Sequence, residues 1–460
     1  MARVPLVLVA LALGLAAVLA AGHRSLALAL SLAALAALVA AAWDADTALA
    51  FLFAFLPFRT WVAAISPLPL HFAADAVVFT LAVRVLVRHP RTLLALDAVE
   101  VLGLLFAAVG LLATVHAHVR LAGAALELRD LMLFWLLYAA VRRLQAAGEG
   151  PSPDLWPRLV PLAVAAVAVI GLQGLGALAF PPLGHLLPGA WQHEAISRVN
   201  RGRPYGLVNN PNVFGELALF ALVLAYFRAR ANAFAPLAAF LPLTAFLLAM
   251  VLFSYSRTAW LVAFLALAVA FAAARAAGER VGLVLAAVAL AAGIAFLPHA
   301  HHRAVTVASR STLRHSARAG RLETLRLAVA LVRRRPLGTG LGTFGSGAAH
   351  VFHQSAPGVP HRFYADDNYA AILVETGPLG LVLFLLTGLA VLYRIRTAEA
   401  PADPRLAAFM LFLALAVIAA AANAWEELEL TLYPWATLAL LSGRRRPLPS
   451  LPARLMAGRA

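Results

Sequence analysis

The stretch DNYAAILVETGPLGLVLFLLTGLAVLY, residues 367–393, decides the fold class of this chain. Behind its polar beginning it is almost wholly apolar, and Arg394 and Arg396 follow within three residues of its end. A helix of about 20 apolar residues is long enough to cross the hydrocarbon core of a bilayer. The stretch therefore predicts a transmembrane helix that starts beside two acids, Asp366 and Asp367, and ends beside two arginines.

Similar runs fill most of the chain. Hydrophobic residues make up 63% of the sequence and charged residues 13%, whereas soluble domains carry roughly 45–50% apolar and about 25% charged residues. Candidate spans lie near residues 4–21, 24–43, 47–66, 71–88, 97–117, 123–143, 158–180, 209–227, 234–252, 257–275, 281–297, 367–393, 406–424 and 428–442. We expect an all-α polytopic membrane protein with about 12–14 transmembrane helices, the lower number applying if pieces of 24–66 are re-entrant. The first run is expected to be a retained span rather than a cleaved signal peptide, because another span follows at once.

The arginines predict the orientation of these spans. Short cytosolic loops are enriched in basic residues, and an N-terminus inside puts six basic loops inside: Arg84/Arg88/Arg91, Arg142/Arg143, Arg228/Arg230, Arg275/Arg280, Arg394/Arg396 and Arg444/Arg445/Arg446. The same alternation puts segments 181–208, 253–256 and 298–366 outside. The net charge of +16 is thus expected to serve topology and anionic lipid head groups, with no role in nucleic-acid binding. The absence of cysteine excludes disulfides and thiolate metal sites.

Four regions follow from this pattern. Residues 1–200 form an N-terminal transmembrane bundle, 201–297 a transmembrane core, 298–366 one large extracytoplasmic loop, and 367–460 a C-terminal segment of three spans. Within the loop, the apolar positions 322, 325, 329 and 332 recur at helical spacing. They predict a helix that lies on the membrane surface and ends before Pro336.

Two arginines stand at the edge of predicted spans on the outer side. Arg203 precedes Asn209-Asn210-Pro211-Asn212, a turn that leads into a helix N-terminus, and Arg257 begins the span 257–275. Charge at the edge of hydrocarbon is costly and usually marks a function. Because a guanidinium binds phosphate with a planar fork, both arginines are candidate phosphate-binding residues. The alternative is that they only reach lipid head groups.

The end of the large loop carries candidate acid–base residues. His361, Asp366 and Asp367 could each take a proton from an acceptor hydroxyl. The alternative for Asp367 is ordinary capping of the next helix. Asp366 and Asp367 could also hold a divalent cation through their oxygens, but paired acids are too common to indicate a metal site. The histidines at 299, 301 and 302 have no acids near them in sequence, so no metal is expected.

Two further features of this region invite interpretation. Gly338-Thr339-Gly340-Leu341-Gly342-Thr343-Phe344-Gly345 lacks the ending of a nucleotide-binding P-loop, so a flexible turn is expected there. Glu375 lies two turns into the span and should have a partner, such as an arginine.

Several of these motifs occur together in a known family. Arg203-Pro204-Tyr205-Gly206 with Asn209-Asn210-Pro211-Asn212, Ser256-Arg257-Thr258, Pro336-Leu337-Gly338-Thr339-Gly340 with Phe344, and Asn368-Tyr369 with Glu375-Thr376-Gly377 lie in this order along the chain. In this order they resemble the motifs of the O-antigen ligase and O-antigen polymerase superfamily, over roughly residues 200–390. The first 200 residues resemble the family only in hydrophobicity.

The resemblance implies an inverting glycosyltransferase of the GT-C type, without metal or other cofactor, in the bacterial cytoplasmic membrane. Its donor would be a glycan on undecaprenyl pyrophosphate and its acceptor a hydroxyl of a glycan or glycolipid on the outer face. Arg203 and Arg257 would bind the pyrophosphate. Asp367 stands where the ligases have a histidine, which makes it the first candidate for the base, before His361 and Asp366. Supporting candidates are Asn368, Tyr369, Asn212 and Arg321.

Two other classes of function remain open. A transporter or flippase of lipid-linked glycans should carry charges at mid-span and show paired halves, whereas here the candidates gather at one face. A non-catalytic subunit of an envelope assembly complex would tolerate loss of both arginines.

Overall fold

The computed structural model describes residues 44–65, 72–152, 154–187, 191, 202–231, 237–306, 321–360 and 363–442. Predicted spans 4–21 and 24–43 therefore lie outside the described residues. Within these ranges the chain forms helices and no strand, which agrees with the expected all-α class. The elements are α3 Ala45–Phe55, η1 Leu56–Phe58, α4 Arg59–Ile65, α5 Ala73–Arg88, η3 Pro90–Leu94, α6 Ala98–His116, α7 Leu121–Ala146, α8 Trp156–Ala179, η4 Pro181–Leu186, η5 Gly206–Val208, α10 Pro211–Ala231, α11 Leu237–Phe253, α12 Arg257–Ala273, α13 Ala277–Phe296, α14 Pro298–Val305, α16 Arg321–Arg334, α17 Gly347–Val351, α18 Asn368–Thr397, α19 Ala402–Ala419 and α20 Leu428–Ser442.

Each predicted span from 47–66 onward coincides with a helix or, for 47–66, with the continuous α3–η1–α4 segment. Seven helical segments of the described chain are long and apolar enough to cross a membrane: 45–65, α6, α8, α10, α13, α18 and α19. Two shorter apolar helices, 241–253 and α12, accompany them. The protein is therefore a polytopic membrane protein, as its composition predicted.

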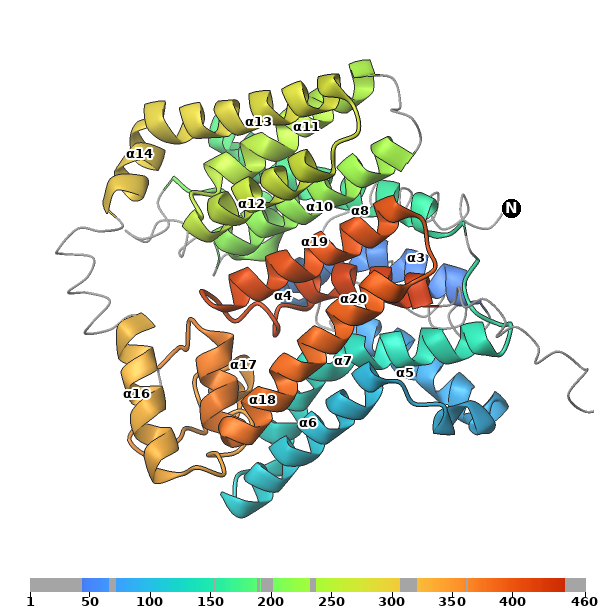
Figure 1. Ribbon diagram of the computed structural model, residues 1–460. Helices are drawn as coiled ribbons and strands as arrows, with labels where there is room; N and C mark the ends of the chain where they lie inside the picture. The colour runs from blue at the N-terminus through green and yellow to red at the C-terminus, as the bar shows by residue number, and fades with distance from the viewer. Residues whose placement is uncertain are drawn as a thin grey trace, which may run out of the picture.

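The helices pack lengthwise into one bundle, in which α14, α16 and α17 lie at the same side as the beginnings of α12 and α18 (Figure 1). We call this side the arginine end, for the residues described below. At the opposite end the predicted cytosolic arginines meet carboxylates. Arg84 binds Glu149 at 2.5 Å, Arg230 binds Asp403 at 3.1 Å, and Arg143 contacts the buried Glu100. Salt bridges thus close this end of the apolar core.

Helix α18 is interrupted where its sequence reads Gly377-Pro378. Gly377 has φ 71° and ψ 178°, a conformation that glycine adopts without a steric penalty. Pro378 has no N–H to continue the helical ladder. The freed carbonyls of Val374 and Glu375 instead accept hydrogen bonds from the N–H groups of Thr339 (2.9 Å) and Gly340 (3.0 Å). The glycine-rich loop 338–345 is thereby fixed against the broken span.

The same loop closes around a carboxylate. Glu375, 1% exposed, accepts hydrogen bonds from the N–H groups of Gly342 (2.9 Å), Thr343 (2.8 Å) and Phe344 (2.8 Å). The expectation of a flexible turn was wrong, since the loop is buried and hydrogen-bonded. Glu375 does have partners, as expected, but they are main-chain amides and not an arginine; amides oriented in this way form a concave binding site for an anion.

We predict that Glu375→Ala strongly destabilises the protein. It would leave three buried N–H groups without their acceptor, at about 1–3 kcal/mol each. The unfolding midpoint of purified protein in detergent should fall sharply, and less for Glu375→Gln, whose remaining oxygen still accepts. Glu399→Ala, at an exposed position at the opposite end, is the control. Equal midpoints for Glu375→Ala and the control would contradict this role.

The predicted loop helix is confirmed as α16, which ends at Arg334, before Pro336. One face, with Ala328 and Leu331, packs against a small core around Phe344, and the predicted position Val332 joins that core. Leu322, Leu325 and Val329 remain 42–46% exposed. Of the predicted apolar positions, Val332 is therefore packed inside the protein, whereas the other three lie on its surface.

Candidate functional site

Arg203 is held at the arginine end by two fixed acceptors. Its Nε donates to the main-chain oxygen of Ser254 at 2.9 Å, and its Nη2 donates to Oδ1 of Asn212 at 2.8 Å. Asn212 stands in the first turn of α10. These bonds orient the guanidinium between the starts of α10 and α12.

The sequence before α10 explains how Asn212 is placed. Asn209 adopts a left-handed conformation with φ 55°, which asparagine tolerates better than most residues. Oδ1 of Asn210 then accepts from the N–H of Asn212 at 2.9 Å, and Pro211 occupies the first helical position, where its missing N–H costs nothing. The Asn-Asn-Pro-Asn turn is therefore a rigid support for Arg203.

Arg257 is the first residue of α12 and its side chain is exposed. The preceding turn is tightly built: Oγ of Ser254 accepts from the N–H of Ser256 at 3.1 Å, and Ser256 caps the helix through the N–H of Ala259. Tyr255 between them has φ 51°. Segment 254–256, which we call the arginine turn, therefore fixes the backbone from which Arg257 projects.

A third arginine joins this turn. Arg303, in α14, donates from Nη1 to the main-chain oxygen of Tyr255 at 3.2 Å. Sequence reasoning missed it, because it is one of many arginines in the loop. The available signal was Pro298 directly after a span, which favours a short helix that turns the chain back over the bundle.

The three guanidinium groups are close enough to perturb one another. Burial, and then the positive charges of Arg303 and Arg257, lower the pKa of Arg203 to about 9, which still leaves it charged at neutral pH. Burial and Arg257 likewise lower the pKa of Arg303. Like charges gathered in this way repel, and a bound anion would relieve that repulsion. The arrangement is suited to a ligand with several negative charges.

The start of α18 is tied into the bundle by the residues predicted there. Asp367 is the N-cap, with Oδ1 accepting from the N–H groups of Tyr369 (2.9 Å) and Ala370 (3.1 Å). Oδ1 of Asn368 accepts from the N–H of Trp425 at 3.0 Å, and the Tyr369 hydroxyl donates to the main-chain oxygen of Ala416 at 2.8 Å. Asn368 thus fastens α18 to the α19–α20 connection, and Tyr369 fastens it to α19.

The remaining predicted residues are placed as follows. Asp366 is exposed beside the capped Asp367. His361 lies outside the described residues. Arg321 begins α16, but its side chain is outside the described part, and it is not brought to the arginine turn by any described contact.

A layer of acids lies next to the arginines. Little in the sequence distinguished these acids as candidate site residues. Glu127 of α7 is 2% exposed, and Oε2 of Glu426 accepts from the N–H of Gly347 at 3.0 Å. Burial, and then Glu429, raise the pKa of Glu427 to about 8. Glu216, one helical turn beyond Asn212, interacts electrostatically with both Arg203 and Glu427. The acids therefore continue from the arginines across the same end of the bundle.

Among the described residues, no group of three or more histidines and acids is arranged to hold a metal ion. His299, His301 and His302 lie on the short α14.

The family model described as "O-Antigen ligase" matches residues 242–385. The match runs from α11 into α18 and contains Arg257, Arg303, Asp367 and Glu375. It confirms the resemblance for this segment, whereas Arg203 and its Asn-Pro-Asn turn, counted within the resemblance above, lie before it. No curated protein matches the chain.

Proposed function

We propose that the chain, whose residues 242–385 match the O-antigen ligase family model, transfers a glycan from undecaprenyl pyrophosphate to a hydroxyl of an acceptor glycan or glycolipid. The observation that carries this proposal is the meeting of Arg203, Arg257 and Arg303 at the arginine turn. A lipid pyrophosphate is an anion with several charges that lies at the edge of the hydrocarbon, where these guanidiniums lie. We place the arginine end outside the cytosol.

In this proposal the arginines bind the donor and stabilise the departing charge. The acceptor oxygen forms a bond to the anomeric carbon while the bond from that carbon to the phosphate oxygen breaks. The bonding electrons leave with the pyrophosphate, and the fixed guanidiniums stabilise the negative charge that develops on it. Attack opposite the leaving group inverts the anomeric configuration.

The acceptor proton needs a base as the new bond forms. Asp367 is the first candidate, and His361 and Asp366 follow. Oδ1 of Asp367 already accepts two cap hydrogen bonds. An ionised carboxylate has two oxygens, and the other one can still take a proton. The acid layer begins next to α18, because Asn368 binds Trp425, the residue before Glu426.

The experiment that tests this function is transfer by purified protein from an undecaprenyl-pyrophosphoryl glycan to a range of hydroxyl acceptors. We expect transfer to at least one acceptor, with the same rate in a chelator, because guanidiniums supply the charge that a metal would otherwise supply. Loss of activity in chelator would instead assign Asp366 and Asp367 to a metal.

Two other outcomes would reject the proposal. Movement of the intact lipid-linked glycan across reconstituted vesicles, without transfer, would identify a transporter. A protein that neither transfers nor moves the glycan would fit a non-catalytic subunit. The acceptor that works would also separate a ligase from a polymerase.

A further inference from the structure

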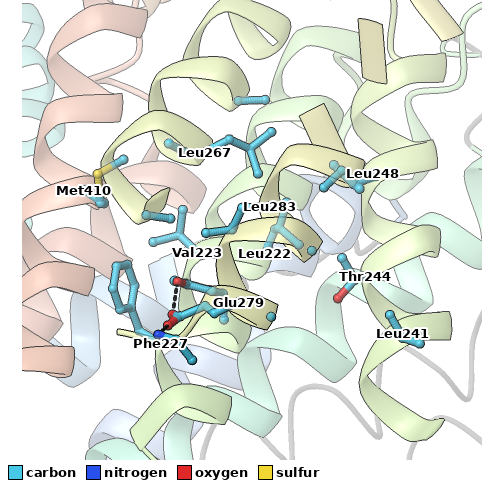
Figure 2. Close-up of a pocket in the computed structure, with 18 residues that line it drawn as sticks. Leu222, Val223, Phe227, Leu241, Thr244, Leu248, Leu267, Glu279, Leu283 and Met410 are labelled. Carbon is cyan, nitrogen blue, oxygen red and sulfur yellow. Dashed lines mark hydrogen bonds between the residues drawn. The ribbon is translucent and has the colours of Figure 1, made fainter. Parts of the chain in front are cut away.

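A large apolar chamber lies in the half of the bundle away from the arginine turn. Its volume is about 550 Å³, and it lies between α10, α11, α12 and α13, with Met410 of α19 at one side. Figure 2 shows Leu222, Val223 and Phe227 of α10 facing Leu283 of α13, with Thr244 and Leu248 of α11 beyond them. The chamber is far larger than the engineered cavity of roughly 150 Å³ that binds benzene.

Small residues create this space. On α13, Gly278 and Gly282 line the chamber, and a Cβ added at either position would meet no atom within 4 Å. On α12, Ala263, Ala266 and Ala270 line the facing wall. Small residues in membrane helices usually allow the backbones to pack closely. Here they instead border an open volume between the helices.

The walls indicate hydrocarbon as the occupant. Apart from Thr244, Tyr226 and Glu279, the lining is aliphatic, aromatic or glycine. The Glu279 carboxylate is already engaged, since it accepts from the Tyr226 hydroxyl at 2.5 Å and from the N–H of Arg275 at 2.8 Å. An empty cavity of this size would forfeit dispersion contacts over its whole surface. Helix α13, which forms one wall, is largely exposed along its length.

The end of the chamber at Ala276 and Glu279 carries positive charge. Arg275 and Arg280 flank these two lining residues and are both exposed. Nη2 of Arg275 lies 3.5 Å from Asp403, but Asp403 is shared with Arg230 at 3.1 Å. Arg280 makes a hydrogen bond to the main-chain oxygen of Ala274. Among the described residues no carboxylate lies within 4 Å of Arg280, so its charge is available to an anionic head group.

We propose that this chamber binds an acyl chain of an anionic phospholipid, whose phosphate lies on Arg275 and Arg280. The proposal does not depend on the glycan-transfer function. A lipid carrier bound at the arginine turn would have its phosphates at the opposite ends of α10 and α12. From Asn212 to Leu222 alone, α10 rises about 15 Å. Arg275 and Arg280 flank the lining residues Ala276 and Glu279 at the other end, which favours a phospholipid anchored there.

Photolabelling tests the proposal without measuring transfer. The full-length protein is reconstituted into phosphatidylcholine vesicles that contain a little phosphatidylglycerol with a diazirine in its acyl chain. After irradiation, mass spectrometry locates the adducts. We expect them to concentrate on the lining residues of α11, α12 and α13. The double variant Arg275→Gln/Arg280→Gln should reduce labelling by phosphatidylglycerol about fivefold for each arginine and leave labelling by the phosphatidylcholine analogue unchanged.

Filling the chamber supplies the matched comparison. Gly282→Phe should lower labelling several-fold, whereas Ala289→Phe, at an exposed position of the same helix, should not. Gly278→Leu tests the same point with a smaller side chain if Gly282→Phe fails to fold, as judged by its unfolding midpoint. Equal labelling of filled and control variants, or adducts spread evenly around the bundle, would overturn the site. Competition by a polyprenyl phosphate but not by unlabelled phosphatidylglycerol would assign the chamber to the lipid carrier and overturn the phospholipid.

Discussion

Arg203→Ala and Arg257→Ala should each abolish most glycan transfer while the protein still inserts and folds. Removing one preorganised charge from a developing anion typically lowers the rate about 10²–10³-fold. Arg203→Lys and Arg257→Lys should also lose activity, because lysine lacks the planar fork that binds two phosphate oxygens at once. Arg303→Ala should show a smaller loss, since Arg303 lies outside the predicted pair and one of its nitrogens is engaged by Tyr255.

The measurement is the transfer rate of purified variants, together with their affinity for the donor. Arg88→Ala is the control, because Arg88 lies at the opposite end of the bundle and its side chain is 58% exposed. Normal transfer by both Arg203→Ala and Arg257→Ala would remove the phosphate-binding assignment. A variant that folds less well would show a lower unfolding midpoint. This check matters most for Arg203→Ala, because Arg203 links α10 to the arginine turn.

Asp367→Asn is expected to lose most turnover yet keep donor binding and stability. Asparagine caps helices as well as aspartate does, so the bonds to Tyr369 and Ala370 survive, but an amide cannot accept the proton. General-base catalysis contributes about 10²–10⁴-fold.

Two comparisons make this result interpretable. Asp44→Asn makes the same change at the N-cap of α3, where Asp44 accepts from Asp46 and Thr47, and should leave transfer unchanged. Asp367→Ala removes the cap as well, at about 1 kcal/mol. A near-normal rate for Asp367→Asn would leave the acid as a cap alone, and His361→Ala would become the decisive variant.

The sequence predicts the helices of this protein well because the length of an apolar run is read directly from it. Each predicted span between residues 47 and 442 has its helix in the structure, and Pro336 marks the end of α16 as expected. The Asn-Asn-Pro-Asn turn likewise places Arg203 beside the start of α10, because asparagine and proline determine that backbone locally.

Contacts between distant segments could not be predicted in the same way. The glycine loop resembles a flexible turn when considered alone, since the carboxylate that orders it lies more than 30 residues further along. In the sequence Arg303 is one basic residue among many in the loop, and only the fold of α14 shows that it contacts Tyr255. Glu127, Glu216 and Glu427 come from α7, α10 and the α19–α20 connection, and only the packing of these segments brings them to one end of the bundle.

The arginine turn holds Arg203 and Arg303 through main-chain oxygens of Ser254 and Tyr255. Main-chain carbonyls are present whatever side chain a residue carries, so these hydrogen bonds do not depend on which amino acid occupies position 255. Position 255 is therefore a natural place to diversify the protein, with asparagine or glycine suited to its positive φ. A library at this position would alter the surface between Arg257 and Arg303 while both anchors stay in place, which gives a route to reshaping donor preference without rebuilding the site.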